Sequence, residues 1–368
     1  MTDSIDWHGD PYDGLAVPRP VGSDTVARIE DAVADRLRSL GFDVIRQRFE
    51  TGPHRLYAAS IAGAGLGWVA LLTAPFLSLQ VVGWSASLAG LAGVATVAVL
   101  CVGIANRRLP FNAPRVEARN IVAIRSANTR AWLVAHSDTK GQPLSLAGRV
   151  LAVGALGIGL AGLTACLLAR VAGPLPWWAV IPWVLLVMGG GGALSLPPVK
   201  GESAGAVDNA SGLVAVLSAA EKLRHRTDVG VLVTGAEEMG MEGARAWLTS
   251  GGTGELFVNF DGIDNRGAFT MMRHAPPRRR GAELRALQTA IAEALAPDAV
   301  RSSPLPLGIF VDGSVLARGG LTGVTVSRGD WSTLRVVHTV RDVAGRTEAG
   351  PARRAGEAVA VALDRMLG

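Results

Sequence analysis

Charge is scarce in this 368-residue chain, since only 18% of its positions are Asp, Glu, Lys or Arg. Three stretches have none of these residues at all: 56–106, 150–169 and 175–196. A membrane-spanning helix needs about 20 apolar residues, so we expect two spans in the first stretch and one in each of the others. A buried soluble helix is the alternative, and uninterrupted runs of this length disfavour it. The simplest arrangement is two transmembrane helical hairpins.

Cysteine is also scarce, and a signal peptide is missing. The only two cysteines, Cys101 and Cys166, lie inside the uncharged stretches, which excludes a disulfide framework and fits a reducing compartment. The first 49 residues are polar, without an apolar core followed by a cleavage site, so we expect no cleavable signal peptide. The net charge of +5 comes with no nucleic-acid recognition motif, and we expect no nucleic-acid partner.

Positive charge gathers beside the ends of the uncharged stretches that join the polar segments. These cations are Arg46, Arg48, Arg55, Arg107, Arg108, Arg115, Arg119, Lys140, Arg149 and Lys200, whereas the opposite turns hold only Arg170. Positively charged loops stay on the cytoplasmic side of a membrane. We therefore expect a multi-pass protein of the cell (inner) membrane, in contact with the lipid bilayer, whose polar part faces the cytoplasm.

The polar segments alternate between helical and strand patterns. Expected strands lie at 42–49, 120–125, 131–135, 229–233, 256–260, 268–272 and 323–327, and expected helices at 24–40, 212–223, 242–248, 282–295 and 351–367. Such alternation predicts an α/β domain with a mixed, mainly parallel sheet and helices on both faces. The expected ranges are 1–55, 107–148 and 198–368 for this domain, with hairpins at 56–106 and 149–197.

Five potential metal ligands occur at or near the ends of these strands or in nearby loops. They are His136, Asp208, Glu238, Asp261 and His338. A lone histidine or aspartate is usually structural or solvated, but strand ends of an α/β sheet meet at one edge, where sites form. Imidazole and carboxylate ligands without cysteine suit two zinc ions, one carboxylate bridging both. The pattern therefore predicts a metallohydrolase.

The short contexts of these residues carry a resemblance. In order they read His-x-Asp at 136, Asp-Asn-Ala-Ser-Gly at 208, Glu-Glu at 237, Asn-x-Asp at 259 and His-Thr-x-x-Asp at 338. This order resembles the di-zinc exopeptidase family of bacterial leucyl aminopeptidase and yeast aminopeptidase Y. The resemblance covers the chain outside the hairpins and implies a three-layer α/β/α zinc-exopeptidase-like fold.

The resemblance also implies a role for each residue. His136 and Asp261 would bind one Zn²⁺, Glu238 and His338 the other, and Asp208 would bridge them; Glu237 would be the general base. Adjacent glutamates diverge at a strand end, so one can coordinate while the other transfers protons. Asp138 could accept the second N–H of His136 and orient its ring, the alternative being a solvated strand-end carboxylate.

The expected activity is that of an aminopeptidase on a peptide or small amide substrate. Val337 and Val340 stand where the family often has Tyr and Pro, which bears on the substrate rather than on metal binding. Asp312 could pair with a substrate ammonium or could be an ordinary turn residue. Two other readings stay open: a catalytically silent membrane receptor or scaffold on the same fold, and a glutaminyl cyclase-like or carboxypeptidase-type enzyme.

Overall fold

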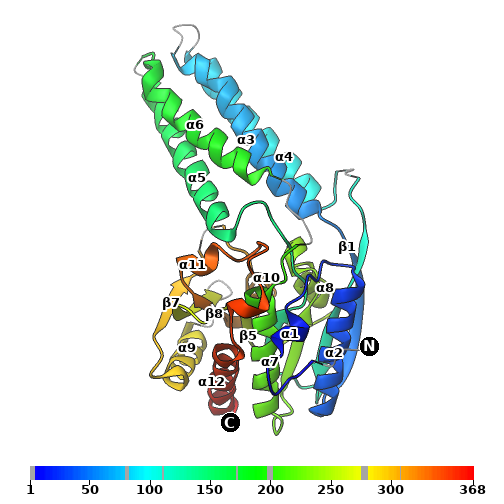
Figure 1. Cartoon of the computed structure of the whole chain (residues 1–368). Helices are drawn as coiled ribbons and strands as arrows, with labels where there is room; N and C mark the ends of the chain where they lie inside the picture. The colour runs from blue at the N-terminus through cyan, green and yellow to red at the C-terminus, as the bar shows by residue number, and fades with distance from the viewer. Residues whose placement is uncertain are drawn as a thin grey trace. The chain divides into compact units, whose positions relative to one another are not determined.

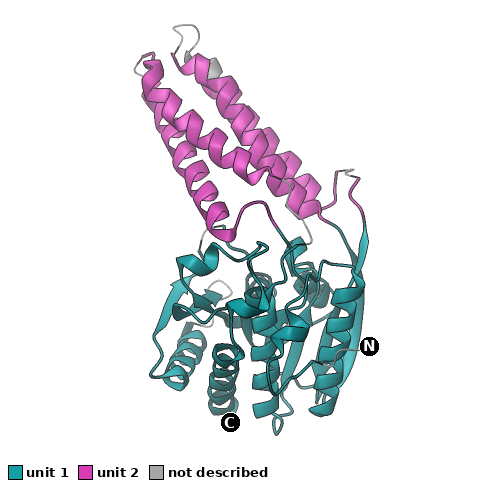
Figure 2. Cartoon of the chain, viewed as in Figure 1, with its two compact units in different colours: residues 1–52, 115–141, 200–368 teal, residues 53–114, 142–199 magenta. Residues whose placement is uncertain are grey.

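The computed structural model describes residues 5–78, 83–109, 112–170, 173–196, 202–274, 281–306 and 308–368. The chain divides into two compact units, coloured separately in Figure 2. Unit 1 comprises Met1–Gly52, Arg115–Gly141 and Lys200–Gly368, and unit 2 comprises Pro53–Pro114 and Gln142–Val199. Position 197, the end of the second expected hairpin, and Lys200 lie outside the described residues.

Unit 1 contains a sheet of eight strands in the order β1-β2-β4-β3-β5-β8-β6-β7. The strands are β1 (Asp43–Thr51), β2 (Val116–Ile124), β3 (Ala131–His136), β4 (Val229–Thr234), β5 (Leu256–Ile263), β6 (Ala268–His274), β7 (Val300–Pro304) and β8 (Thr322–Gly329). The central run β4-β3-β5-β8 is parallel, as is the β6-β7 pair, whereas β1-β2, β2-β4 and β6-β8 pair antiparallel. The sheet is therefore mixed and mainly parallel, as the sequence predicts.

Helices cover both faces of this sheet, as Figure 1 shows. They are α1 (Tyr12–Leu15), α2 (Asp24–Ser39), α7 (Ser211–Lys222), α8 (Glu242–Thr249), α9 (Gly281–Leu295), α10 (Asp312–Arg318), α11 (Trp331–Leu334) and α12 (Ala349–Leu367). Residues of α2, α7, α9 and α12 share one core with Leu133 of β3, whereas residues of α8 and α10 pack against Trp132 and Val134. Successive residues of a strand point to opposite faces, so β3 is buried on both and the fold has three layers.

Element boundaries differ from the sequence expectation mainly in length. The helix expected at 24–40 spans Asp24–Ser39, and the Ser23 side chain accepts the Val26 N–H as its N-cap. The strand expected at 120–125 begins earlier, at Val116, because it pairs along the whole of β1. β7 and α10 were not expected. β7 is a short edge strand without an apolar alternation, and α10 has only seven residues, so neither has a clear period.

Unit 2 consists of helices α3 (His54–Ser78), α4 (Gly83–Ala105), α5 (Leu146–Ala169) and α6 (Trp177–Leu194). Each contains a stretch that is long and apolar enough to cross a membrane, with only 17 to 28% of its residues buried. Glycines let α6 approach its neighbours closely, since a Cβ on Gly63 of α3 would come within 2.6 Å of the Gly191 carbonyl oxygen. Close packing at small residues, with apolar side chains outward, is typical of helices in lipid.

Candidate metal centre

The proposed ligands come together at one edge of the unit 1 sheet. His136 ends β3, Glu238 follows β4 in the short turn η3 (Glu237–Met239), and Asp261 lies near the end of β5. Since β3, β4 and β5 are parallel neighbours, these residues share the carboxyl edge. Loops bring the others there: Asp208 from η2 (Ala206–Ala210) and His338 from the segment after α11.

Two groups of ligand atoms form at this edge, and Asp208 belongs to both. His136, Asp208 and Asp261 make one group, and Asp208, Glu238 and His338 make the other, with the atoms of each group within 4.8 Å of one another. Asp208 Oδ1 lies 3.0 Å from His136 Nε2, while Oδ2 lies 2.9 Å from His338 Nε2. The carboxylate thus presents one oxygen to each group, which is the arrangement a bridging ligand requires.

The donor atoms fit zinc in chemistry and in spacing. Zn–N and Zn–O bonds of about 2.0–2.2 Å place tetrahedral ligand atoms about 3.3–3.6 Å apart. His136 Nε2 lies 3.9 Å from Asp261 Oδ1, and His338 Nε2 lies 3.3 Å from Glu238 Oε1. Glu238 Oε1, an atom of the second group, is buried without a hydrogen-bond partner. His338 also adopts a left-handed φ of 66°, a strain that is common at functional sites.

The Asp138 carboxylate does not make the expected hydrogen bond to the His136 ring. The contact at 3.0 Å from His136 Nδ1 is the backbone carbonyl of Asp138, whereas its carboxylate Oδ1 lies 3.8 Å from that nitrogen. The carboxylate instead accepts the N–H groups of Glu237 and Glu238, at 3.1 and 3.0 Å. The expected imidazole–carboxylate hydrogen bond is therefore replaced, and the Asp138 side chain fixes the turn that carries both glutamates. Burial raises the pKa of Asp138 to about 7.

Glu237 is buried but belongs to neither ligand group. Burial raises its carboxyl pKa well above the ordinary value, and the nearby carboxyls of Glu238 and Asp312 raise it further, while His136 lowers it. Asp312, whose pKa burial raises to about 6, accepts a short hydrogen bond from the Thr234 hydroxyl. A cation bound beside these carboxyl groups would favour their ionised forms and lower their pKa values, which fits the metal interpretation.

Lys140 was predicted to be one of the cations that flank the membrane spans, but it contacts the metal centre. Its ammonium forms a short ion pair with Glu238 Oε2. Burial works against ionisation of Glu238, but the charge of Lys140 prevails and lowers the pKa of that carboxyl to about 2. Arg119 was also interpreted as a flanking cation, yet it pairs with the buried Glu30 at 2.5 Å. The charges of both residues are thus engaged within unit 1.

Arg19, which carries no sequence signal, is fully buried beside the site. Its guanidinium donates to the carbonyl groups of Ser137 at 2.8 Å, Val17 and Ala204 at 3.0 Å, and Gly205 at 3.2 Å. It therefore joins the loop after β3 to the loop before η2, two segments that the second hairpin separates along the chain.

Asp342, the last residue of the His-Thr-x-x-Asp pattern that begins at 338, holds the first residues of η2. Its carboxylate accepts the N–H of Val207 at 2.7 Å and that of Asp208 at 3.1 Å. Burial raises the pKa of Asp342 to about 6. Arg19 and Asp342 together fix the backbone that leads into the bridging aspartate.

Comparisons with known proteins agree with this fold. The model of peptidase family M28 matches residues 189–363, and no curated protein matches the chain. The aminopeptidase from Aneurinibacillus sp. strain AM-1 is 13% identical, with a TM-score of 0.54 over 99% of this chain and 95% of that one. BSAP, a zinc aminopeptidase from Bacillus subtilis, is 14% identical, with a TM-score of 0.57 over 96% of this chain and 94% of that one.

A glutaminyl cyclase from Porphyromonas gingivalis is as similar in fold. It is 14% identical, with a TM-score of 0.54 over 100% of this chain and 98% of that one. At such identities the likeness establishes the fold alone. With the M28 match, it supports a zinc exopeptidase-type function and leaves the choice between peptide hydrolysis and cyclisation open.

Proposed function

We propose that this protein is a membrane-integral zinc aminopeptidase that hydrolyses the N-terminal peptide bond of its substrate. The observation that carries the proposal is Asp208, whose two oxygens each face a histidine of a different ligand group. His136 and Asp261 would hold one zinc ion, and Glu238 and His338 the other. When bound, zinc polarises the substrate carbonyl group and makes a water molecule more acidic.

Glu237 supplies the proton transfer in this proposal. Its buried carboxylate lies outside both ligand groups, so it is free to take a proton from the attacking water and return it to the leaving amine. The N–H bonds to Asp138 hold the turn that positions Glu237 beside the ligand Glu238. A scaffold without catalytic activity has no need of such a carboxylate.

Membrane anchoring rests on unit 2. Its four helices are long and apolar enough to span a bilayer, and large apolar side chains such as Leu91 (62% exposed) and Leu185 (64% exposed) face outward. Arg107 and Arg108 are exposed after α4, on the side where the chain returns to unit 1. The positive-inside rule then assigns unit 1 to the cytoplasm.

The test is a substrate screen with matched variants of the full chain, purified in detergent. Aminoacyl anilides, their N-acetylated forms and glutaminyl peptides are compared, and zinc is counted in the same samples. We expect only the free-amino anilides to be hydrolysed. Glu237→Gln should keep its zinc and lose about 10²-fold or more in rate, while Glu293→Gln on the exposed surface of α9 should match the parent protein.

Each alternative has a distinct result in this screen. Release of ammonia from glutaminyl peptides without anilide hydrolysis would indicate a cyclase, and hydrolysis of N-blocked peptides from the carboxyl end would indicate a carboxypeptidase. Zinc binding without turnover of any substrate would favour the receptor or scaffold. Parallel loss of zinc and activity in Glu237→Gln would move this residue into the ligand set.

A further inference from the structure

A short segment of unit 1 has a buried side at the metal centre and an exposed apolar side. We call residues 331–343 the rim segment. Its buried members include the ligand His338 and Asp342, which holds η2. Its exposed members include Trp331 (43% exposed), Val340 (61% exposed) and Val343 (45% exposed). The same stretch therefore builds the site and presents apolar side chains outward.

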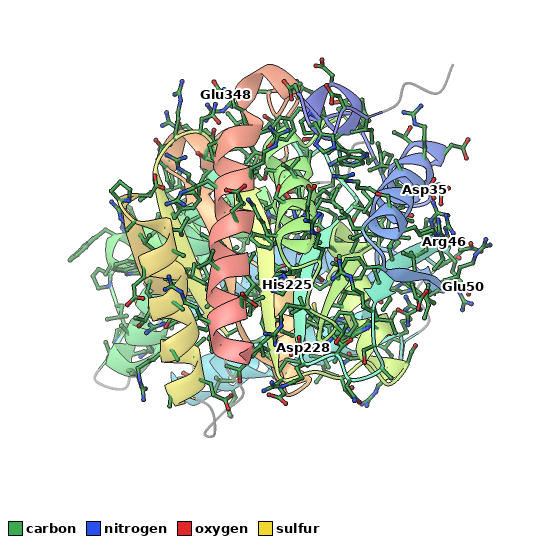
Figure 3. All side chains as sticks on the ribbon, turned by 90° about the horizontal axis from the view of Figure 1, so that it is seen from below. Asp35, Arg46, Glu50, His225, Asp228 and Glu348 are labelled. Carbon is green, nitrogen blue, oxygen red and sulfur yellow. The ribbon has the colours of Figure 1, made fainter. Side chains whose placement is uncertain are left out.

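The exposed apolar side chains of unit 1 are concentrated in the rim segment. Only six large hydrophobic residues are exposed among the described residues of unit 1, and three of them lie in the rim segment. The other end of unit 1 carries charged side chains, as Figure 3 shows around His225 and Asp228. Single exposed apolar residues are ordinary, but a group of them beside a site marks a contact surface.

The exposed charge of the rim segment is positive. Arg335 and Arg341 are exposed, and neither forms a salt bridge within the part of the chain that the structure describes. The only carboxylate of the segment, Asp342, is buried. Tryptophan with arginine and aliphatic side chains is the composition of protein surfaces at the membrane interface, where anionic headgroups attract the cations.

Both hairpins are joined to unit 1 at the same edge of the sheet as the rim segment. The first leaves after Thr51 of β1 and returns before Val116 of β2, and these two residues are paired. The second leaves just beyond His136 of β3. Because β2 is antiparallel to β4 and β4 is parallel to β3, all these points lie at the carboxyl edge. The rim segment follows β8, which runs parallel to β5 and ends at this edge.

We propose that the rim segment is a lipid-contacting surface that sets the metal centre against the bilayer. Trp331, Val340 and Val343 enter the headgroup region, and Arg335 and Arg341 lie against anionic lipid phosphates. This inference rests on the proposed membrane anchoring and extends the proposed function. The substrates are then peptides whose N-terminus lies at the bilayer surface, rather than peptides free in solution.

The test uses the full chain in nanodiscs that contain an anionic lipid, with Cys101 and Cys166 replaced by serine. A fluorophore is attached at Val340→Cys, at Val361→Cys as an exposed valine control on α12, or at Leu185→Cys on α6. Lipids with a nitroxide in the headgroup or in the acyl chain serve as quenchers. We expect headgroup quenching at 340, none at 361, and acyl-chain quenching at 185.

The outcomes separate this proposal from the membrane anchoring itself. Quenching at 185 with equal, weak quenching at 340 and 361 would overturn the lipid contact and leave anchoring intact. Absence of quenching at 185 would refute anchoring and the rim proposal together. If lipids leave the label at 340 unquenched but an apolar peptide changes its emission, the rim binds peptide and the lipid proposal is wrong. Replacing Arg335 and Arg341 by glutamine should reduce quenching at 340 in anionic discs.

Discussion

Replacing Arg19 by methionine tests how unit 1 holds its metal centre together across the second hairpin. The guanidinium donates to five carbonyl groups, those of Leu15, Val17, Ser137, Ala204 and Gly205. Two of these also accept a backbone N–H: Leu15 from Val17, and Gly205 from Ala210. The change therefore bears mainly on Val17, Ser137 and Ala204. A buried acceptor that loses its partner costs about 1–3 kcal/mol, so the buried carbonyl groups of Ser137 and Ala204 together cost about 2 kcal/mol or more, and the half-buried carbonyl group of Val17 adds less.

Hydrogen exchange read by mass spectrometry measures this loss where it occurs. We expect Arg19→Met to speed exchange in residues 131–141 and 202–210 and to lower the zinc content of the purified chain. Arg19→Lys keeps the charge but offers three donors in place of five. Its exchange rates and zinc content should lie between those of Arg19→Met and those of the parent protein. Unchanged exchange and full zinc occupancy in Arg19→Met would refute the claim that this residue joins the two loops.

Three further predictions concern the bridging aspartate, a buried histidine and the second hairpin. Asp208→Asn should bind neither zinc ion firmly, because it removes the charge between two cations that repel each other; two retained ions with normal turnover would refute the bridge. Burial lowers the pKa of His274 to about 4, so as pH falls from 6.5 to 4 the unfolded chain gains a proton that the folded chain does not. His274 should contribute a loss of about 3 kcal/mol of stability in that window, measured in denaturant titrations as the difference between the parent protein and His274→Gln. Replacing residues 148–198 by a Gly/Ser linker should leave zinc binding intact in detergent, and a folded variant without zinc would show that the second hairpin helps to build the site.

The elements that could be predicted are those in which apolar residues form a clear run or repeat. Buried strands such as β3 and β4 are short apolar runs that end at polar residues, and α2 has a serine cap and an apolar stripe. The clustering of the five proposed ligands could be predicted because their residue types are specific and three of them lie at or near strand ends. β7 and α10 could not, since both are short and without a repeating apolar pattern.

The supporting contacts of the site could not be predicted from sequence. Arg19 lies 118 positions before Ser137 and 186 before Gly205, and nothing near it in the chain signals that loops so distant will meet there. Lys140 was interpreted by its place beside an apolar stretch, whereas its partner Glu238 is set by tertiary packing. The Asp138 carboxylate was assigned to the neighbouring imidazole, yet the turn after β4 offers it two N–H groups instead.

Anomalous scattering at the zinc absorption edge, measured on crystals of the full chain, tests the two-zinc assignment. We expect two zinc peaks. One should lie about 2.0–2.2 Å from atoms of His136, Asp208 and Asp261, and the other at the same distances from Asp208, Glu238 and His338. Glu237 should approach neither ion as a ligand. Absence of zinc from both groups in an active protein would refute the two-zinc site, and coordination by Glu237 would refute its assignment as the general base.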